Sequence, residues 1–454
     1  MSPADSGSHP RDRLPRVLTL WDATMLIVAS VVGAGIFFTP GRVAALLPDG
    51  RFILLAWTVG AVLSLAGALA NAELGAMFPR AGGDYVYLRE GLHPAAGFLV
   101  GWLSFFAIYA GTIAALAVIL GESLARACGF GETGKLAFAA GIILACSALN
   151  VRGVRVGALA NNLTSAMKIA ALLAFVVLGL LLGEGSFTPW FPPAPSQSVL
   201  GSGASFSWAL FGAALSPILF SYLGWNASVY VASEIRDSQR NVPRSLFLGL
   251  ALCAGIYLLL NSVFLYALAP DEMIAVEDAG EAAARALFGA RGGAWISAFV
   301  LVSVLGTLNA TVLVGPRIAY AMALDGLFFE SVDRVHDGYR TPSVAIWVQA
   351  GVSIGLVAFL ESFPKALDFT VFAIVLATSA DVVALFALRH RQPGRSRPYR
   401  TWGYPWVPAA YVVAQLAIGA ALVAESPREC LVTGVLLAIG LPIYFVFARK
   451  RRQP

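Results

Sequence analysis

Apolar residues follow one another along this chain in long runs, and short polar segments separate the runs. Many runs approach or exceed the roughly 20 residues that a helix needs to cross the hydrocarbon core of a bilayer. The pattern predicts about twelve transmembrane helices, at residues 18–46, 52–78, 95–124, 136–150, 159–183, 206–234, 244–269, 293–323, 342–360, 366–389, 404–424 and 429–448. We therefore expect an all-α polytopic membrane protein.

The composition supports a lipid environment. Hydrophobic residues make up 58% of the 454 residues and charged residues only 13%, against roughly 25% charged residues in a typical soluble domain. A soluble protein with so few charges could not cover its surface with polar groups. The lipid bilayer is therefore the expected surrounding of most of the chain.

The positions of the basic residues predict the orientation in the membrane. Most of the 31 Lys and Arg residues lie in the two tails and in every second loop. Cytoplasmic segments carry such an excess of basic residues, so we expect both termini in the cytoplasm and the helices in the cell (inner) membrane. The net charge of +5 follows from this bias and does not indicate a nucleic-acid partner.

The sequence indicates neither a signal peptide nor a metal site. Residues 1–16 are polar and lack the order of basic region, apolar core and cleavage site that a signal peptide shows, so we expect a short disordered tail. The four cysteines have no CxxC spacing and no neighbouring histidine. They are Cys128, Cys146, Cys253 and Cys430. We expect no metal and no cofactor.

Two of the predicted helices contain interruptions near their middles. The first helix holds Gly33-Ala34-Gly35, and the sixth holds Gly224 a few residues after Pro217. Glycine weakens a helix, and proline removes a backbone hydrogen bond. The two interruptions lie five helices apart, which is typical of two inverted five-helix repeats whose first helices are discontinuous.

This pattern divides the chain at helix boundaries, because no linker separates domains. We expect a cytoplasmic tail at residues 1–17, a first repeat with helices 1–5 at 18–183, and a second repeat with helices 6–10 at 184–391. Two further helices and the cytoplasmic C-terminus occupy residues 392–454. The symmetry is inferred from hydropathy, since the two halves show no clear residue-by-residue repeat.

A helix that unwinds inside a membrane exposes backbone N–H and C=O groups, at a cost of roughly several kcal/mol for each group left unsatisfied. A zwitterionic amino acid can satisfy both kinds of group, because its carboxylate suits the N–H groups at the start of a half-helix and its ammonium suits free carbonyls. We assign the carboxylate to the N–H groups of Ala34 and Gly35, and the ammonium to the carbonyls of Val31, Phe220 and Leu223. The predicted substrate-binding residues are Val31, Gly33, Ala34, Gly35, Phe220, Ser221, Tyr222, Leu223, Gly224 and Asn309.

Four stretches of the sequence together resemble the amino acid–polyamine–organocation superfamily. They are Gly33-Ala34-Gly35-Ile36-Phe37; Ala72-Glu73-Leu74-Gly75 with Pro79-Arg80-Ala81-Gly82-Gly83-Asp84-Tyr85-Val86-Tyr87; Phe220 to Asn226 with Glu234 and Arg240-Asn241-Val242-Pro243-Arg244; and Arg397-Pro398-Tyr399-Arg400 with Gly403-Tyr404-Pro405. The resemblance covers nearly the whole chain. Within the superfamily the sequence looks closest to the L-type amino acid transporter branch and its bacterial relatives.

The resemblance implies sodium-independent transport of amino acids, either by exchange or by coupling to protons. It also implies an aromatic lid at Phe220. Ala34 replaces the serine of many relatives, which keeps a backbone contact but removes a hydroxyl contact, and Leu223 replaces a glycine, which narrows the pocket. Some eukaryotic relatives bridge to a partner glycoprotein through a cysteine near the position of Cys128. The rest of this chain shows no sign of such a partner, so we expect no obligatory protein partner.

Lys168 is the only basic residue in the middle of a predicted span. A charge at this depth is costly and usually faces the protein interior with a role there. The resemblance implies that its ammonium mimics a sodium ion and ties the fifth helix to the broken first helix. Two readings stay open, a functional cation or proton switch and a purely structural cation.

Three other positions also leave alternatives open. Asn309 and Thr307 in the eighth span either line the pocket or hydrogen-bond between helices. Glu122 and Asp381 lie nearer the ends of their spans, and a basic substrate would become plausible if either reached the pocket. The acidic loop 270–293 forms either a short lid helix or a solvated loop.

These features favour a transporter over other membrane proteins. An enzyme would need a catalytic set, but the four histidines lie in tails or loops and no HExxH or paired-Asp motif lies in the spans. A channel would need a polar pore stripe, and none is evident. We predict a transporter of amino acids, probable substrates being neutral because spans one and six hold no acidic residue in their interruptions. The alternatives are a cationic amino acid or polyamine antiporter, and an amino acid sensor.

Overall fold

The structure is a computed structural model, and it describes residues 9–47, 49–187, 207–276, 278–359, 363–425 and 427–450. Most of the predicted loop at 183–205, and Glu277 in the acidic loop, lie outside the described residues. The described helices are α1 (Leu20–Val31), α2 (Gly35–Leu46), α3 (Gly50–Met77), α4 (Asp84–Gly91), α5 (Pro94–Leu103), α6 (Ala110–Cys128), α7 (Glu132–Val151), α8 (Val154–Leu182), α9 (Trp208–Ser221), α10 (Ala227–Tyr230), α11 (Ser238–Ala267), α12 (Pro270–Ile274), α13 (Ala279–Val314), α14 (Pro316–Leu324), α15 (Ser343–Phe359), α16 (Phe363–Arg391), α17 (Trp406–Glu425) and α18 (Pro427–Lys450). A π-helical turn, Ser104–Tyr109, joins α5 to α6.

The helices are long and apolar enough to cross a membrane many times. Within the described residues, nine helical stretches meet the length and hydropathy of a membrane span. The pair α1 and α2 meets them as one span bent by 47°, and α9 and Ser343–Ala358 are shorter apolar helices. The expected all-α polytopic membrane protein is confirmed. The count of twelve spans and the two inverted repeats stay predictions.

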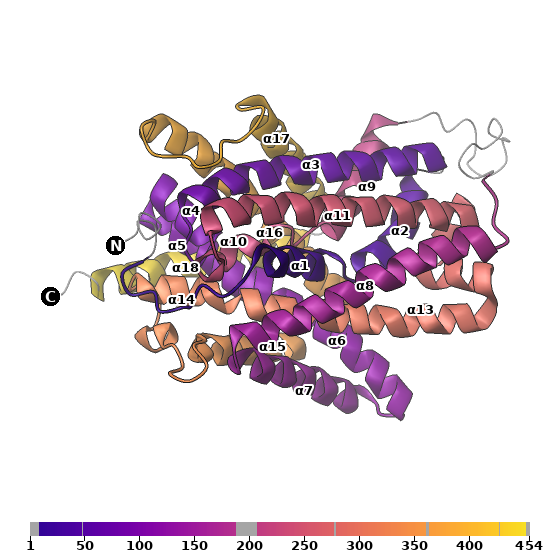
Figure 1. The fold of residues 1–454 in the computed structure, drawn as a ribbon, viewed down its shortest axis with the longest axis horizontal. Coiled ribbons are helices and arrows are strands. Elements are labelled where there is room, and N and C mark those ends of the chain that lie inside the picture. Colours follow the sequence, from indigo (N-terminus) through magenta and orange to yellow (C-terminus); the bar gives the residue numbers. More distant parts are fainter. Residues whose placement is uncertain are drawn as a thin grey trace.

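The broken first helix lies at the centre of the bundle. Helix α1 packs against α11, α8 and α13, and Figure 1 shows these longer helices around it. A capping box between Thr19 and Asp22 starts α1, and α1 ends at Val31, before the sequence Val32-Gly33-Ala34. Because all the neighbours of α1 are themselves buried helices, the unwound segment lies in the protein interior.

The other interrupted segment joins α9 to α10. Helix α9 contains Pro217 and ends at Ser221, and the chain resumes a helix only at Ala227. Gly224 between them has a φ of 98°, a conformation that L-residues with a side chain rarely adopt. The interruptions predicted at glycine-containing sequences are therefore present at both places.

The acidic loop contains helical structure. Helix α12 spans Pro270–Ile274, and α13 starts at Ala279 and is kinked at Gly289. Helix α12 packs on α2 so closely that a methyl group at Gly41 would come within 2.6 Å of the Met273 carbonyl oxygen. The short-helix alternative fits this arrangement better than a solvated loop does.

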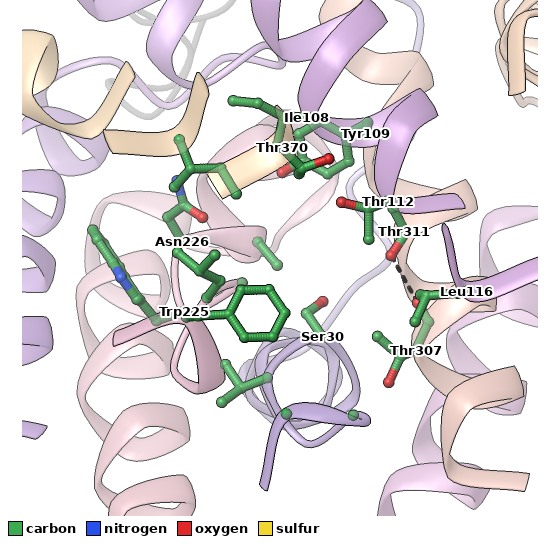
Figure 2. Close-up of a pocket in the computed structure, with 18 of the residues that line it drawn as sticks. Ser30, Ile108, Tyr109, Thr112, Leu116, Trp225, Asn226, Thr307, Thr311 and Thr370 are labelled. Carbon is green, nitrogen blue, oxygen red and sulfur yellow. Dashed lines mark hydrogen bonds between the residues drawn. The ribbon is translucent and has the colours of Figure 1, made fainter. Parts of the chain in front are cut away.

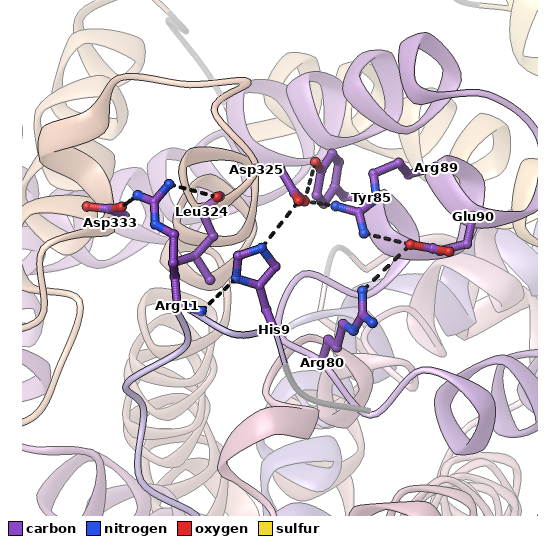
Figure 3. Close-up of polar contacts among 9 residues, drawn as sticks. All are labelled: His9, Arg11, Arg80, Tyr85, Arg89, Glu90, Leu324, Asp325 and Asp333. Carbon is purple, nitrogen blue, oxygen red and sulfur yellow. Dashed lines mark hydrogen bonds and ion pairs between the residues drawn. The ribbon is translucent and has the colours of Figure 1, made fainter. Parts of the chain in front are cut away.

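Charged residues tie the N-terminal segment to one end of the bundle (Figure 3). Arg11 is ion-paired with Asp333, and His9 lies 3.6 Å from Asp325. Asp325 is also paired with Arg89. The segment thus bridges the region before α5 and the loop after α14. The described chain begins and ends at this same end of the molecule (Figure 1).

Candidate substrate site at the two helix breaks

The two interrupted segments face each other directly. A methyl group at Gly35 would come within 2.9 Å of Ser221 Oγ and 3.0 Å of Ser221 Cα. A methyl group at Gly224 would come within 2.8 Å of Ser30 Cβ and 3.0 Å of the Ser30 carbonyl carbon. Glycine on each side therefore allows the backbone of one break to contact the other break, and a side chain at either position would separate them.

Lys168 holds the unwound end of α1. Its ammonium donates hydrogen bonds to the carbonyl oxygens of Val32 at 2.6 Å and Ala29 at 3.2 Å, and to Thr307 Oγ1 at 3.0 Å. The Ser303 hydroxyl donates to Val32 O at 3.2 Å. The last carbonyls of a helix carry the negative end of its dipole, so a buried cation is well placed there. The contact between α8 and the first break is observed, and the role of Lys168 in coupling stays a prediction.

Tyr257 connects the two breaks with one hydroxyl group. It lies on α11, is fully buried, and its Oη lies 2.8 Å from Val31 O and 3.0 Å from Ser221 O. A hydroxyl group has one proton to donate, so the two carbonyls compete for it. The end of α1 and the end of α9 are thus held by the same side chain.

A cavity opens between the breaks. It contains about 1050 Å³ of atom-free space, counting the part open to solvent, which is at the upper end of the roughly 300–1,000 Å³ of small-ligand pockets. Figure 2 shows Trp225 and Asn226 on one side of it and Thr112, Thr307 and Thr311 on the other. Hydroxyl groups are frequent in its wall, from Ser30, Thr112, Thr307, Thr311, Thr370 and Thr378.

Most of the predicted binding residues line this cavity. They are Val31, Gly33, Ala34, Gly35, Phe220, Ser221, Leu223 and Gly224. Two predicted residues, Tyr222 and Asn309, are not in its wall. The Tyr222 ring is fully buried and packs on Trp57 and Tyr257. Substrate contact by these residues stays a prediction, which for Tyr222 and Asn309 has no contact with the cavity to support it.

Asn309 instead belongs to a chain of amides between helices. Its Oδ1 accepts from Asn150 Nδ2 at 2.8 Å, and its Nδ2 donates to Asn161 Oδ1 at 2.7 Å. The three residues lie on α7, α13 and α8. Of the two alternatives for Asn309, hydrogen bonding between helices matches the contacts.

The two acidic residues with open roles are separated by the structure. Glu122 is paired with Lys135 at 2.7 Å and its side chain is 38% exposed, so it lies away from the cavity. Asp381 is fully buried and is not in the cavity wall, but it lies within hydrogen-bonding reach of Asp84, which is.

Sequence reasoning missed several wall residues. Asp84, Tyr230 and Asn226 line the cavity and form a hydrogen-bonded series, since Asn226 Nδ2 donates to Tyr230 Oη at 3.2 Å and Tyr230 donates to Asp84 Oδ2 at 2.5 Å. Asp84 stood in the sequence as part of a loop motif between two spans. Its only signal was an acidic residue directly after Gly82-Gly83 in that motif, which does not say that the loop folds inward.

No group of three or more His, Cys, Asp or Glu residues arranged to hold a metal ion occurs in the part of the chain that the structure describes. The wall instead offers hydroxyl groups, backbone groups and one carboxyl group. This set suits a small polar organic molecule with apolar parts, since Ile108, Leu116, Phe220 and Leu223 complete the wall.

Comparison with known proteins identifies the family. A family model described as amino acid permease matches residues 18–445. The chain belongs to the amino acid permease family. The serine/threonine exchanger SteT of Bacillus subtilis (strain 168) is 31% identical over 450 residues, which cover 98% of this chain and 99% of that protein.

Relatives in animals are more distant and cover the chain as fully. The large neutral amino acids transporter small subunit 2 of Mus musculus is 27% identical over 97% of this chain and 82% of that protein. The Asc-type amino acid transporter 1 of Homo sapiens is 24% identical over 99% and 85%. The resemblance to L-type transporters and their bacterial relatives is confirmed. This permease is therefore an amino acid transporter, not an enzyme, as expected.

Proposed function

We propose that this permease exchanges small neutral amino acids across the membrane by alternating access, without sodium. The observation that carries the proposal is the pair of interrupted helices that face each other across one cavity. A free half-helix start and free carbonyls within the same cavity suit the two charged ends of an amino acid. Neither end needs a charged side chain.

The substrate carboxylate is assigned to the start of α2. The first N–H groups of a helix have no carbonyl one turn earlier to accept from them, and in α2 these groups follow the sequence Gly33-Ala34-Gly35 in the cavity wall. The positive end of the α2 dipole adds to the attraction for an anion, typically by about 0.3–1 kcal/mol at exposed sites and more when buried.

The ammonium group is assigned to carbonyls at the breaks, and their present partners rank them. Val31 O already accepts from Tyr257 at 2.8 Å and from Gly33 N at 2.9 Å, so it is the weakest of the three predicted acceptors. Phe220 O accepts from Leu223 N at 3.0 Å and keeps a second lone pair. We therefore favour the carbonyls of Phe220 and Leu223 in the second break.

The substrate side chain is proposed to be small. Phe220 and Leu223 narrow one wall, and threonine hydroxyl groups are available from Thr112, Thr311 and Thr370. Such a wall fits a side chain the size of serine or threonine better than a large aromatic one. The printed name of the Bacillus subtilis relative, a serine/threonine exchanger, supports the same substrate class.

The placement in the membrane is also a proposal. We infer a protein of the cell membrane with about twelve spans, two inverted repeats and both termini in the cytoplasm. The distribution of Lys and Arg supports this orientation, and the common end of the described chain in Figure 1 agrees with an even number of spans. The mouse relative is named a small subunit, but we propose that this chain works without a partner protein.

Exchange by the purified protein tests the function. The protein would be reconstituted alone into sodium-free liposomes that are either empty or loaded with serine, and uptake of labelled serine would be measured. Uptake into loaded vesicles well above uptake into empty vesicles is expected of an exchanger. Equal uptake into empty vesicles would refute exchange, and binding of serine without uptake would refute transport and favour an amino acid sensor.

A further inference from the structure

A pair of buried carboxyl groups lies beside the cavity, and nothing proposed above uses it. Asp84 starts α4, and Asp381 lies within α16. Their side chains are 1% and 0% exposed, and the two carboxyl groups lie within hydrogen-bonding reach of each other. Two carboxylates so close in a dry place repel each other, and such pairs hold a proton between them.

The surroundings of the pair offer hydrogen bonds but no positive charge. Tyr230 donates to Asp84 Oδ2 at 2.5 Å, and Asn71 Nδ2 donates to Asp381 Oδ2 at 3.1 Å. Oδ1 of each carboxyl group accepts from no other donor in the described part of the chain. Two donors for four carboxylate oxygens can support one negative charge, and the second charge requires a proton.

The titratable side chains that face the pair are all phenols. They come from four elements and are Tyr87, Tyr109, Tyr230 and Tyr411. Among the described residues, no lysine, arginine or histidine forms an ion pair with Asp84 or Asp381; Arg389, on the same helix as Asp381, is paired with Glu73 instead. Burial raises the pKa of the Asp84 carboxyl group. A proton is therefore the only cation available to the pair within the protein.

We propose that Asp84 and Asp381 form a proton-binding site whose occupancy is linked to substrate binding in the neighbouring cavity. The proton comes from solution and returns to solution, and only an O–H bond forms and breaks. This proposal rests on the proposed function, because it names a second ligand of the same transport cycle.

The contacts supply the link between the proton and the substrate. Asp84 is held by Tyr230, Tyr230 accepts from Asn226, and all three residues line the cavity. Asn226 ends the second break and Tyr230 ends α10, so a substrate that fixes this break also fixes Tyr230. Fixed Tyr230 keeps Asp84 against Asp381, which favours the protonated pair. Loss of the proton would drive the two carboxylates apart and loosen the same break.

The geometry favours a proton over a cationic substrate group. An ammonium or guanidinium group would need to replace its water shell with several oxygen atoms at once. Asp84 presents only an edge to the cavity and Asp381 is not in its wall. A proton needs no such room, and it satisfies both free Oδ1 atoms by one hydrogen bond between them.

The test compares wild type with Asp381→Asn, Asp84→Asn and a matched control, Asp337→Asn, which changes an exposed carboxyl group elsewhere. The amide of an asparagine can donate to the remaining carboxylate, so each dyad variant keeps a hydrogen bond and removes the shared proton. Serine binding to purified protein would be measured by titration calorimetry from about pH 5 to about pH 8, in two buffers of different ionisation enthalpy, which counts the protons taken up.

Wild type and the control are expected to take up protons with serine and to bind serine more weakly as pH rises, by up to about tenfold per pH unit for one linked proton. Either dyad variant is expected to lose both effects. Wild-type affinity that is constant over this range with no proton uptake would overturn the proposal. Exchange in the liposome assay would then still stand, whereas absence of serine binding and exchange at every pH would overturn the proposed function itself.

Two further readings guard the result against loss of fold and against a cationic substrate. The infrared band of a protonated carboxyl group is expected in wild type at about pH 7 and not in Asp381→Asn; its absence from wild type refutes the shared proton without any variant. Binding of arginine tighter than serine in wild type, and lost in Asp84→Asn, would show that the pair receives a cationic substrate group instead.

Discussion

Replacing Lys168 by methionine would remove the ammonium group from the first break while keeping an unbranched side chain of similar length. The ammonium group has three acceptors, Val32 O, Thr307 Oγ1 and Ala29 O, at 2.6–3.2 Å. Methionine offers these acceptors nothing. Because a methionine fills nearly the same volume, no large cavity adds to the effect, as it would in an alanine variant.

The expected magnitude follows from what the acceptors keep. Hydrogen bonds to charged groups are worth about 1.5–3 kcal/mol each, but Val32 O retains the hydroxyl of Ser303 at 3.2 Å and Ala29 O retains that of Thr307 at 2.9 Å. Removal of a buried charge also removes its desolvation cost. We therefore expect a small change in global stability and a loss of about 2 kcal/mol in the order of the break. If the substrate must restore that order, its affinity falls about 30-fold.

The assay measures serine affinity and melting temperature for Lys168→Met beside Lys135→Met, a surface lysine paired with Glu122. The expected result is weak serine binding by Lys168→Met with a melting temperature within a few degrees of wild type. Wild-type affinity and exchange at all pH values would show that Lys168 is neither a coupling cation nor a support of the break. A large loss of melting temperature together with affinity would leave only the purely structural reading.

Three further perturbations test other parts of the structure. Gly224→Ala should abolish exchange, because the alanine would keep a φ of 98° at a cost of about 1–2 kcal/mol and place its methyl group 2.8 Å from Ser30 Cβ. Asp278→Asn should raise the melting temperature relative to wild type above about pH 6 and not at about pH 4, since burial raises the pKa of Asp278 to about 6. Asp325→Asn should release the N-terminal segment, so that trypsin cuts after Arg11 faster than in wild type.

The sign of the Asp278 effect follows from proton binding. Between the unfolded pKa of about 3.9 and the native pKa of about 6, the native state holds a proton that the unfolded chain has released. The stability that this carboxyl group contributes is therefore complete at low pH and is lost as pH rises through about 6, and asparagine does not show the loss. A melting-temperature difference that stays constant with pH would refute this reasoning.

Matched variants control the other two predictions. Gly434→Ala adds a methyl group with nothing within 4 Å, so exchange and melting temperature should match wild type; a defect equal to that of Gly224→Ala would refute the steric argument. Asp337→Asn removes an exposed charge from the same loop region as Asp333 and should leave trypsin cleavage unchanged. Equal cleavage rates for Asp325→Asn and wild type would show that Asp325 does not hold the segment.

The sequence alone predicted what depends on local backbone chemistry. Glycine and proline mark the two breaks because they change the backbone at their own positions, and hydropathy marks long spans because lipid contact requires apolar residues throughout. Lys168 was recognisable because a charge in an apolar run is costly wherever it lies. These signals need no knowledge of which helices become neighbours.

Contacts between distant segments were not predictable in this way. Glu234 is paired with Arg317 at 2.8 Å inside the protein, and Asp84 with Asp381, although each pair is far apart in sequence. The pairing depends on how the loop before α4 folds under α16, which no periodicity encodes. Asn309 shows the converse, since a polar residue in a span has the same sequence signal whether it faces a cavity or another helix.

The distribution of donors around the breaks indicates how the site can respond to substrate. The carbonyls at the end of α1 are already occupied by Lys168, Thr307 and Tyr257, whereas the start of α2 has no comparable acceptor in the cavity wall other than what enters it. A substrate carboxylate therefore completes the first break. Because Tyr257 shares its one proton between Val31 O and Ser221 O, a substrate ammonium that binds at the second break shifts that proton toward the first. Each break is thus stabilised by what binds at the other, so the cavity closes fully only around a molecule that carries both charges.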